Sequence, residues 1–367
     1  MVVCEKQYFT NVMDSQIQKN HRIIIAGPCA AESKEQLFET AKEISELRVS
    51  NFMFNHFDFN FFRAGIWKAR TSPNDFQGVG IEALKWLQEI KKQFGFKICV
   101  EVASAQHAQL CLENNVDAVW IGARTTVNPF LVQDIADVVK NSSIIVLIKN
   151  PINPDFNLWV GAIKRFQNVN INNIMAVHRG FSVENENVFR NAPCWEIPVA
   201  LKMKMPDIPV LCDISHIAGD VSLQQTVAQT AINYGFDGLM IEVHHAPETA
   251  LSDKKQQLLP SQFAHLLKDI TFSTSKNEAD HALLIQRNLI KNIDIQISKL
   301  LSKRMEIVDE IAKIKSKHTL PALQPEQWKR VGEVYDENAL QDENYQQFLQ
   351  EFLLLLHKSS LKRQEEI

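Results

Sequence analysis

The chain has 367 residues, of which 45% are hydrophobic and 22% are charged, and its formal net charge is −4. At roughly 150 residues per domain, this length fits about two domains, or one large α/β barrel with an appendage. The slightly acidic balance gives no sign of a nucleic-acid partner, no apolar run approaches the roughly 18 residues of a membrane span, and no signal-peptide pattern opens the chain, so we expect a cytoplasmic protein that acts on small molecules.

Short apolar, β-branched runs alternate with amphipathic stretches between Arg22 and about Phe272. The runs predict eight strands, at Ile23–Ala26, Phe61–Ala64, Ile98–Val102, Ala118–Ile121, Ile144–Ile148, Ile174–Val177, Val210–Cys212 and Leu239–Val243. The stretches between them predict helices. Near-continuous apolar strands separated by helices indicate a parallel sheet buried on both faces, and eight such units predict an α/β fold of the (β/α)₈ TIM-barrel type.

One segment breaks this alternation. Asn51–Phe62 holds six Phe and three Asn in twelve residues, between the first predicted helix and the second predicted strand. We expect it to be a long connection on the face opposite the site. Its Phe side chains are predicted to pack under the barrel, not to bind a ligand.

The pattern changes to pure helix after residues 273–280, which lack large apolar side chains and resemble a linker. Apolar residues recur at three- and four-residue spacing from Leu283 to Ile314, and such a helix would be about 50 Å long at about 1.5 Å per residue. Two shorter helices follow, around Glu326–Glu337 and Asn344–Gln364. We therefore predict three parts: a barrel domain at 1–272, a linker at 273–280, and an all-α, three-helix domain at 281–367. The long apolar stripe needs a second copy of the chain to cover it, which predicts a homodimer or higher homo-oligomer.

Polar or ionisable groups stand at or just after the end of every predicted strand. In a TIM barrel, the carboxyl ends of the strands meet at one mouth, where the active site lies. A single charge at a strand end is usually a solvated rim residue. Eight polar or ionisable groups at the corresponding ends of eight strands instead predict a common site. These groups are Cys29, Arg63, Glu101, Arg124, Lys149, Arg179, His216 and Glu242.

Four of the residues near this mouth form a candidate metal site: Cys29, His216, Glu242 and Asp253. Taken alone, a cysteine such as Cys29 is more commonly an inert buried thiol, and His216 would be a hydrogen-bonded core histidine. Together, a thiolate, an imidazole and two carboxylates form a mixed soft and hard set. Such a set suits Mn²⁺, Fe²⁺, Co²⁺ or Zn²⁺ better than Mg²⁺ or Ca²⁺.

Five cations from four different strand ends would surround the same mouth. Arg side chains bind phosphate or carboxylate groups through bidentate hydrogen bonds, and Lys supplies a point charge. A substrate with a phosphate and a carboxylate would use all five, and Arg70-Thr71 lies further out in position for a second phosphate. The five are Arg63, Lys68, Arg124, Lys149 and Arg179.

From about Ile23 to Phe272 the chain resembles the short type I subgroup of 3-deoxy-D-arabino-heptulosonate 7-phosphate (DAHP) synthases. The resemblance rests on the motifs Ala26-Gly-Pro-Cys29, Arg63-Ala-Gly-Ile-Trp-Lys-Ala-Arg-Thr71, Ile121-Gly-Ala-Arg124, Leu147-Ile-Lys-Asn150, Asp213-Ile-Ser-His216, Ile241-Glu-Val-His244 and Ala250-Leu-Ser-Asp253. It implies condensation of phosphoenolpyruvate with erythrose 4-phosphate.

The resemblance also implies residue roles. It places the divalent metal ion on Cys29, His216, Glu242 and Asp253, phosphoenolpyruvate against the five cations, and erythrose 4-phosphate against Lys68, Arg70 and Thr71. Lys68, Cys29 and His216 would be catalytic. Lys68 is either the proton donor to the developing alkoxide or purely a phosphate clamp.

Residues 281–366 resemble the dimeric, all-helical chorismate mutases. The resemblance rests on Arg287, Asp294, Arg304, Lys315 and the C-terminal segment Ser360-Leu-Lys-Arg-Gln364. The resemblance implies that Arg304, Lys315 and Gln364 are catalytic, and that Arg287 and Ser360 also bind chorismate. At about 100° per residue Arg287 is rotated by roughly 100° from Arg304, and it lies far along the helix axis, so it cannot serve the same pocket within one chain. In a pair of intertwined chains we expect it to reach the pocket of the partner. Alternatively, these residues are surface cations of a coiled coil.

Two other functions remain open. The first is 3-deoxy-octulosonate 8-phosphate synthase, a related enzyme that uses arabinose 5-phosphate; the Lys68-Ala-Arg-Thr71 loop and the mutase-like tail disfavour it. The second keeps the tail as a non-catalytic dimerisation and regulatory module. Gln324 and Trp328, which stand where many chorismate mutases carry an acid pair, favour that alternative.

Ala69 stands where DAHP synthases usually carry a proline. Proline would restrict φ before Arg70, so Ala69→Pro is expected to pre-organise the loop by ~0.5–1 kcal/mol and to lower the KM for erythrose 4-phosphate about two- to fivefold. Steady-state kinetics with each substrate varied in turn would measure this. The KM for phosphoenolpyruvate serves as the internal control, and an unchanged KM for the sugar phosphate would contradict the prediction.

Overall fold

The computed structural model describes residues 21–49, 56–68, 72, 74–184, 186, 188–272, 278–321 and 343–365. The chain divides into two compact units, Met1–Ile285 and Gln286–Ile367. The predicted linker covers residues 273–277, which lie outside the described residues, and residues 278–280, which are helical.

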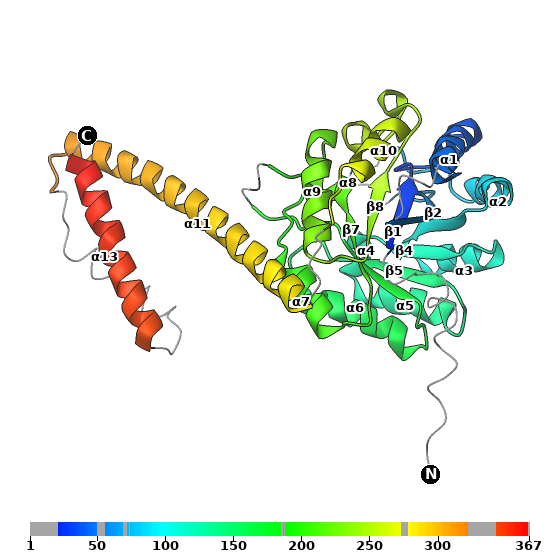
Figure 1. Ribbon diagram of the computed structural model, residues 1–367, viewed down its shortest axis with the longest axis horizontal. Helices are drawn as coiled ribbons and strands as arrows, with labels where there is room; N and C mark the ends of the chain where they lie inside the picture. Colours follow the sequence, from blue (N-terminus) through cyan, green and yellow to red (C-terminus); the bar gives the residue numbers. More distant parts are fainter. Residues whose placement is uncertain are drawn as a thin grey trace, which may run out of the picture. The chain divides into compact units, whose positions relative to one another are not determined.

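The first unit is a closed barrel of parallel strands in the order β1 to β8 (Figure 1), which confirms the TIM-barrel prediction. The last strand pairs with the first, and Glu242 lies opposite Gly27 in that pair. The strands are β1 Arg22–Gly27, β2 Phe57–Ala64, β3 Lys97–Val102, β4 Ala118–Ile121, β5 Ile145–Lys149, β6 Ile174–His178, β7 Val210–Asp213 and β8 Gly238–Glu242.

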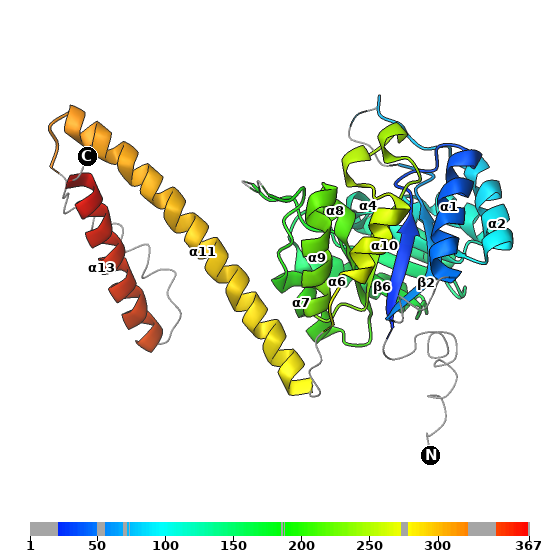
Figure 2. The same ribbon diagram turned by 45° about the horizontal axis from the view of Figure 1, so that its top comes forward.

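Helices surround the barrel on its outside (Figure 2). Several begin at side chains that accept hydrogen bonds from the first backbone N–H groups: Ser104 before α3, Asn128 before α5 and Asp155 before α6. The helices are α1 Lys34–Val49, α2 Glu82–Phe94, α3 Ala105–Glu113, α4 Ala123–Thr126, α5 Pro129–Val139, α6 Phe156–Asn168, α7 Glu196–Lys204, α8 Ile214–Ala218, α9 Val221–Asn233 and α10 Pro260–Lys268, with short 3₁₀ turns η2 Pro247–Thr249 and η3 Lys254–Gln256.

The barrel interior explains the position of the site. Successive strand residues point to opposite faces, so every second residue of each strand faces inward. A buried cluster of such residues includes Phe61, Cys99, Trp120, Leu147, Leu211 and Met240. Two positions further along five of these strands stand Arg63, Glu101, Lys149, Asp213 and Glu242. The alternation that fills the core with apolar side chains therefore places a layer of charged side chains on top of it.

The Phe-rich segment is only partly a connection. Strand β2 begins at Phe57, so the prediction of a connection was wrong for residues 57–60, whereas the strand predicted at Phe61–Ala64 is confirmed. Residues 51–55 lie outside the described residues. Phe57 and Phe59 are buried, and the ring of Phe59 lies 5.8 Å from that of Phe263 in α10. This contact confirms that these side chains pack within the protein.

The second unit contains a long helix beside a shorter one. Helix α11 spans Glu278–Lys317 and α13 spans Glu343–Glu365. Val308 and Ala312 of α11 and Leu353 and Leu356 of α13 are buried. The predicted helix around Glu326–Glu337 lies outside the described residues. None of the helices in the described ranges is long and apolar enough to cross a membrane.

Candidate active site

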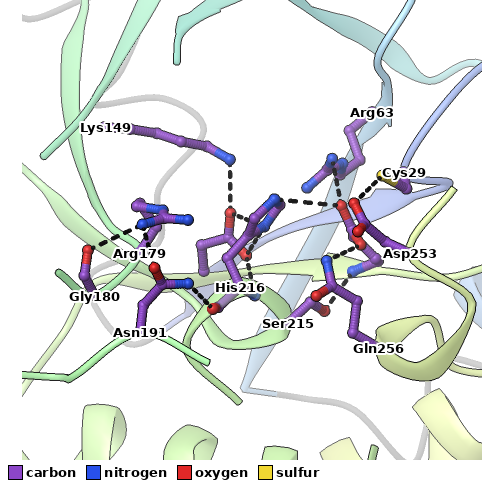
Figure 3. Close-up of polar contacts among 12 residues, drawn as sticks. Cys29, Arg63, Lys149, Arg179, Gly180, Asn191, Ser215, His216, Asp253 and Gln256 are labelled. Atoms are coloured by element: carbon purple, nitrogen blue, oxygen red, sulfur yellow. Dashed lines mark hydrogen bonds and ion pairs between the residues drawn. The ribbon is translucent and has the colours of Figure 1, made fainter. Parts of the chain in front are cut away.

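A cluster of possible metal ligands lies at the carboxyl ends of β1 and β8. One ligand atom each of Cys29, Glu242 and Asp253 lies within 4.8 Å of the others. The Cys29 thiol donates to Asp253 Oδ2 at 3.1 Å, and His216 Nε2 lies 3.8 Å from Glu242 Oε1 (Figure 3). The structure thus brings the four predicted ligands together, although they are separated by up to 224 positions in sequence.

These residues fit a divalent metal ion. Burial, followed by the nearby Glu242 and Asp253 carboxylates, raises the pKa of the Cys29 thiol to about 12. Burial also lowers the pKa of His216, which leaves its imidazole neutral, the form that binds a metal. Glu242 is buried and Asp253 is partly buried, and both carboxylates lie close to the thiol. A divalent ion bound by all three groups would reduce the repulsion among their negative charges.

Asp213 orients His216. Its carboxylate lies 2.9 Å from His216 Nδ1 and also accepts from the His216 backbone N–H at 3.2 Å. On its other side it accepts from Lys149 Nζ at 2.7 Å. Although burial alone would raise it, the pKa of Asp213 is held well below its usual range by His216 and Lys149. A histidine whose Nδ1–H is held by a carboxylate presents Nε2 to a metal ion.

Arg63 offers the clearest sign of an anionic ligand. Its side chain is fully buried, lies over the Trp120 ring at 4.9 Å and donates from Nη2 to Glu242 Oε1 at 3.1 Å. Its Nε and Nη1 atoms are also buried but have no hydrogen-bond partner among the described residues. Buried guanidinium N–H groups are rarely left unpaired, so these two groups are available to an acceptor such as phosphate or carboxylate.

Lys68 lies between the metal cluster and the open mouth. Its Nζ donates to the Cys29 backbone oxygen at 2.9 Å and to Cys29 Sγ at 3.2 Å. Burial lowers the pKa of Lys68, but Cys29, Glu101 and Glu242 outweigh this effect and raise it, so the amine is charged. A charged amine here can bind a phosphate or donate a proton.

A cavity of about 330 Å³ opens above this layer of charges. Such a volume suits a small metabolite. Burial and the neighbouring Arg190 and Arg124 lower the pKa of Arg179 to about 10, because like charges converge on the same space. The cavity is lined by all five predicted cations, Arg63, Lys68, Arg124, Lys149 and Arg179, together with Glu101, Arg190, Asn191, His216 and Asp253.

Several residues of the site were not predicted from the sequence. Asn191 accepts from Arg179 Nη1 at 2.7 Å and donates to the His216 backbone oxygen at 2.6 Å, so it joins a predicted substrate residue to a predicted metal ligand. Arg190 and Gln256 also contact predicted ligands. Asp213 was noted with His216 in one motif at a strand end but was given no role there; in the structure it contacts His216. The predicted residues Arg70 and Thr71 lie outside the described residues.

In the helical unit, the structure pairs four of the predicted residues. Arg304 Nη1 donates to Ser360 Oγ at 2.6 Å, and Lys315 Nζ donates to Gln364 Oε1 at 3.2 Å. Both pairs join α11 to α13. Arg287 is exposed and lies about 25 Å along α11 from Arg304, as the rise of a helix requires. Gln324 and Trp328 lie outside the described residues.

Comparison with known proteins agrees with both units. The DAHP synthetase I family matches residues 4–276, and chorismate mutase type II matches residues 286–365. A phospho-2-dehydro-3-deoxyheptonate aldolase of Thermotoga maritima is 30% identical over 257 residues, which are 70% of this chain and 71% of that relative. A 2-dehydro-3-deoxyphosphooctonate aldolase of Helicobacter pylori is 29% identical over 276 residues, covering 68% of this chain and 94% of the relative. A crystal structure of the Thermotoga maritima DAHP synthase superposes with a TM-score of 0.60 at 30% identity, covering 68% of each chain.

The chain belongs to the DAHP synthetase I family. The matched helical region adds a second class of enzyme to the same polypeptide. The protein is thus a bifunctional enzyme of aromatic amino acid biosynthesis, in which a DAHP synthase domain precedes a chorismate mutase domain.

Substitution of Gly27 tests how closely the ends of β1 and β2 pack together. A Cβ at this position would lie 2.2 Å from the Arg63 backbone oxygen, and φ is +145°. Gly27→Ala is expected to lower the free energy of unfolding by about 1–3 kcal/mol and, by displacing Arg63, to weaken phosphoenolpyruvate binding. Urea denaturation and calorimetric titration would measure the two effects.

Gly161→Ala in α6 is the matched control, because no heavy atom lies within 4 Å of its added Cβ. It is expected to stabilise the helix by ~0.5–1 kcal/mol and to leave ligand binding unchanged. If the two variants had the same free energy of unfolding and the same affinity for phosphoenolpyruvate, the close packing described for Gly27 would be contradicted.

Proposed function

We propose that the barrel joins phosphoenolpyruvate to erythrose 4-phosphate, giving DAHP and inorganic phosphate. The observation that carries this proposal is Arg63, a fully buried guanidinium whose Nε and Nη1 lack partners among the described residues, next to a cluster of metal-binding groups. It supports an anionic substrate held beside a metal ion. Family membership supports the identity of that substrate.

Phosphoenolpyruvate is proposed to occupy the inner part of the cavity. Arg63, Lys149 and Arg179 would hold it from the β2, β5 and β6 ends, with Lys68 and Arg124 closer to the mouth. Erythrose 4-phosphate would then enter last, with its phosphate at Arg70 and Thr71 and its aldehyde beside Lys68. Holding two anions in one orientation removes much of the entropic cost of their encounter.

Cys29, His216, Glu242 and Asp253 would hold the divalent ion, and Mn²⁺, Fe²⁺, Co²⁺ and Zn²⁺ all suit this donor set. When bound, such an ion supplies Lewis acidity to the aldehyde oxygen. Lys68 lies at the edge of this cluster, where it is positioned to donate a proton to the same oxygen.

In the proposed reaction, C3 of phosphoenolpyruvate forms a bond to the aldehyde carbon, and the aldehyde oxygen takes up a proton. Water adds at C2 and loses one proton, which leaves a hydroxyl group at C2. The C2–O bond to phosphate then breaks as this hydroxyl gives its remaining proton to the departing phosphate, and C2 becomes the ketone carbon of DAHP. Arg63, Lys149 and Arg179 stabilise the charge on the departing phosphate. No covalent bond to the protein is needed.

The barrel reaction can be tested by phosphate release from phosphoenolpyruvate. We expect release with erythrose 4-phosphate but not with arabinose 5-phosphate, loss of release with a chelator, and recovery on adding Mn²⁺, Co²⁺ or Zn²⁺. Arg63→Lys should abolish most activity, because Lys lacks the forked donor geometry. Arg165→Lys in α6 is the matched control and should be active.

Release with arabinose 5-phosphate instead would favour 2-dehydro-3-deoxyphosphooctonate synthesis, the activity named for the Helicobacter pylori relative. Release unaffected by chelation would overturn the proposed metal dependence.

For the helical unit, we propose chorismate binding between α11 and α13. Arg304 and Lys315 would hold the carboxylate and the ether oxygen, with Ser360 and Gln364 beside them. In the rearrangement the ether C–O bond breaks as a new C–C bond forms, and hydrogen bonds to the ether oxygen stabilise the charge that develops there. The partner subunit's Arg287 would complete the pocket. Exposed apolar residues along α11, among them Leu283, Ile290, Ile297 and Leu300, support a dimer that covers them.

Mixing two inactive variants tests the shared pocket. Arg287→Ala and Arg304→Ala should each abolish prephenate formation. If the chains are unfolded, mixed equally and refolded together, half of the dimers are mixed and each has one intact pocket, so about one quarter of the wild-type activity should return. No recovery despite exchange would contradict the shared pocket. Absence of prephenate formation by the wild-type chain would instead favour a non-catalytic tail.

A further inference from the structure

Two residues outside the proposed ligand set hold the far sides of its carboxylates. Asp253 Oδ2 faces the Cys29 thiol, whereas its Oδ1 accepts from Arg190 Nη1 at 3.0 Å. Glu242 Oε1 faces His216 and Arg63, whereas its Oε2 accepts from Gln256 Nε2 at 2.6 Å (Figure 3). Each carboxylate thus turns one oxygen toward the cluster and has the other held from outside.

The two outside residues also contact each other. Arg190 Nη1 donates to Gln256 Oε1 as well as to Asp253. A continuous chain of hydrogen bonds therefore runs from Asp253 through Arg190 and Gln256 to Glu242. We call Arg190 and Gln256 the brace.

We propose that the brace positions Asp253 and Glu242 so that each offers a single oxygen to the metal ion. This inference rests on the metal site of the proposed function. Arg190 and Gln256 are positioning residues, since they act through the two carboxylates.

The brace is itself fixed on both sides. Gln256 is only 1% exposed; its backbone oxygen accepts from Gln224 Nε2 at 2.6 Å, and its backbone N–H donates to the Asp253 backbone oxygen at 3.1 Å. Arg190 packs over Gly219, where an added Cβ would lie 2.4 Å from the Arg190 Cβ. These contacts hold both side chains where they can orient the carboxylates.

Single-oxygen donation has a chemical consequence. Two carboxylates that each give one oxygen, with one thiolate and one imidazole, form a compact four-donor set of the kind that Zn²⁺ and Co²⁺ accept. Carboxylates free to turn would instead bind through both oxygens, as larger cations prefer. The brace therefore favours a small divalent ion and a single geometry.

Gln256→Met in the full-length chain removes both side-chain hydrogen bonds while keeping the volume. Loss of such outer contacts is expected to weaken Co²⁺ binding by about 10- to 100-fold. The thiolate-to-Co²⁺ absorption band and the visible d–d bands would report affinity and geometry directly, and we expect the d–d bands to shift. Neither reading depends on catalytic turnover.

Gln133→Met is the matched control. Gln133 in α5 accepts from Arg165 Nη1 of α6 at 3.0 Å, so it is another Arg–Gln pair, but none of the proposed ligands takes part in it. Its Co²⁺ affinity and spectrum should match those of the wild type.

Arg190→Met is the second variant, and because the Arg190 side chain is 44% exposed its loss should leave the fold intact. We expect the same spectral shift. Because the two residues act as one unit, the double variant should lose less Co²⁺ affinity than the sum of the two single losses. If Gln256→Met unfolds in chelator, Arg190→Met alone decides the question.

Wild-type Co²⁺ affinity and spectrum in both brace variants would overturn the brace and leave the metal site standing. Failure of the wild-type chain to bind Co²⁺ would overturn the metal site of the proposed function, and the brace with it.

Discussion

The buried ion pairs at the barrel mouth are the constraint on which the site depends. Arg63 with Glu242 and Lys149 with Asp213 are almost fully removed from water, at distances of 3.1 and 2.7 Å. Pairs of this kind seldom stabilise a fold more than apolar side chains would, whereas removing one partner typically costs about 3–5 kcal/mol. Their presence on top of an apolar core is therefore better explained by chemistry than by stability. In each pair, a cation that is proposed to bind the substrate contacts a carboxylate of the metal site: Glu242 is a proposed ligand, and Asp213 orients the ligand His216.

The alternation of strand residues made much of this site predictable. Once strands at 97–102 and 145–149 are recognised, Glu101 and Lys149 must project from the same end of the barrel as Arg63 and Glu242. That rule needs only strand positions, which the apolar runs supply. It says nothing about Arg190, Asn191 or Gln256, because these lie in connections whose path depends on long-range contacts. Arg190 reaches Asp253 across 63 positions, and no local pattern predicts such a contact.

The prediction missed residues 57–60 of β2 for a physical reason. The composition of this segment was unusual enough to suggest an irregular connection, yet Phe57-Asp-Phe-Asn-Phe61 alternates apolar and polar residues as a strand does. In β2 the burial follows that alternation, with Phe57 and Phe59 buried and Asp58 and Asn60 partly exposed. The period of two was the stronger signal. By contrast, the roles of Arg70, Thr71, Gln324 and Trp328 stay predictions, as do the domain limits and the cytoplasmic location.

His216 connects the two halves of the site. Its ring is oriented by Asp213, which also binds Lys149, and its backbone oxygen binds Asn191, which also binds Arg179. Two cations that face the substrate cavity therefore each lie one hydrogen-bonded residue away from the same proposed metal ligand. A substrate anion and a metal ion bound here would be held by one continuous polar network. Asp213 is fully buried and, unlike Arg63 and Lys149, is not among the residues that line the cavity. Its place in this network explains why a charged side chain is buried there.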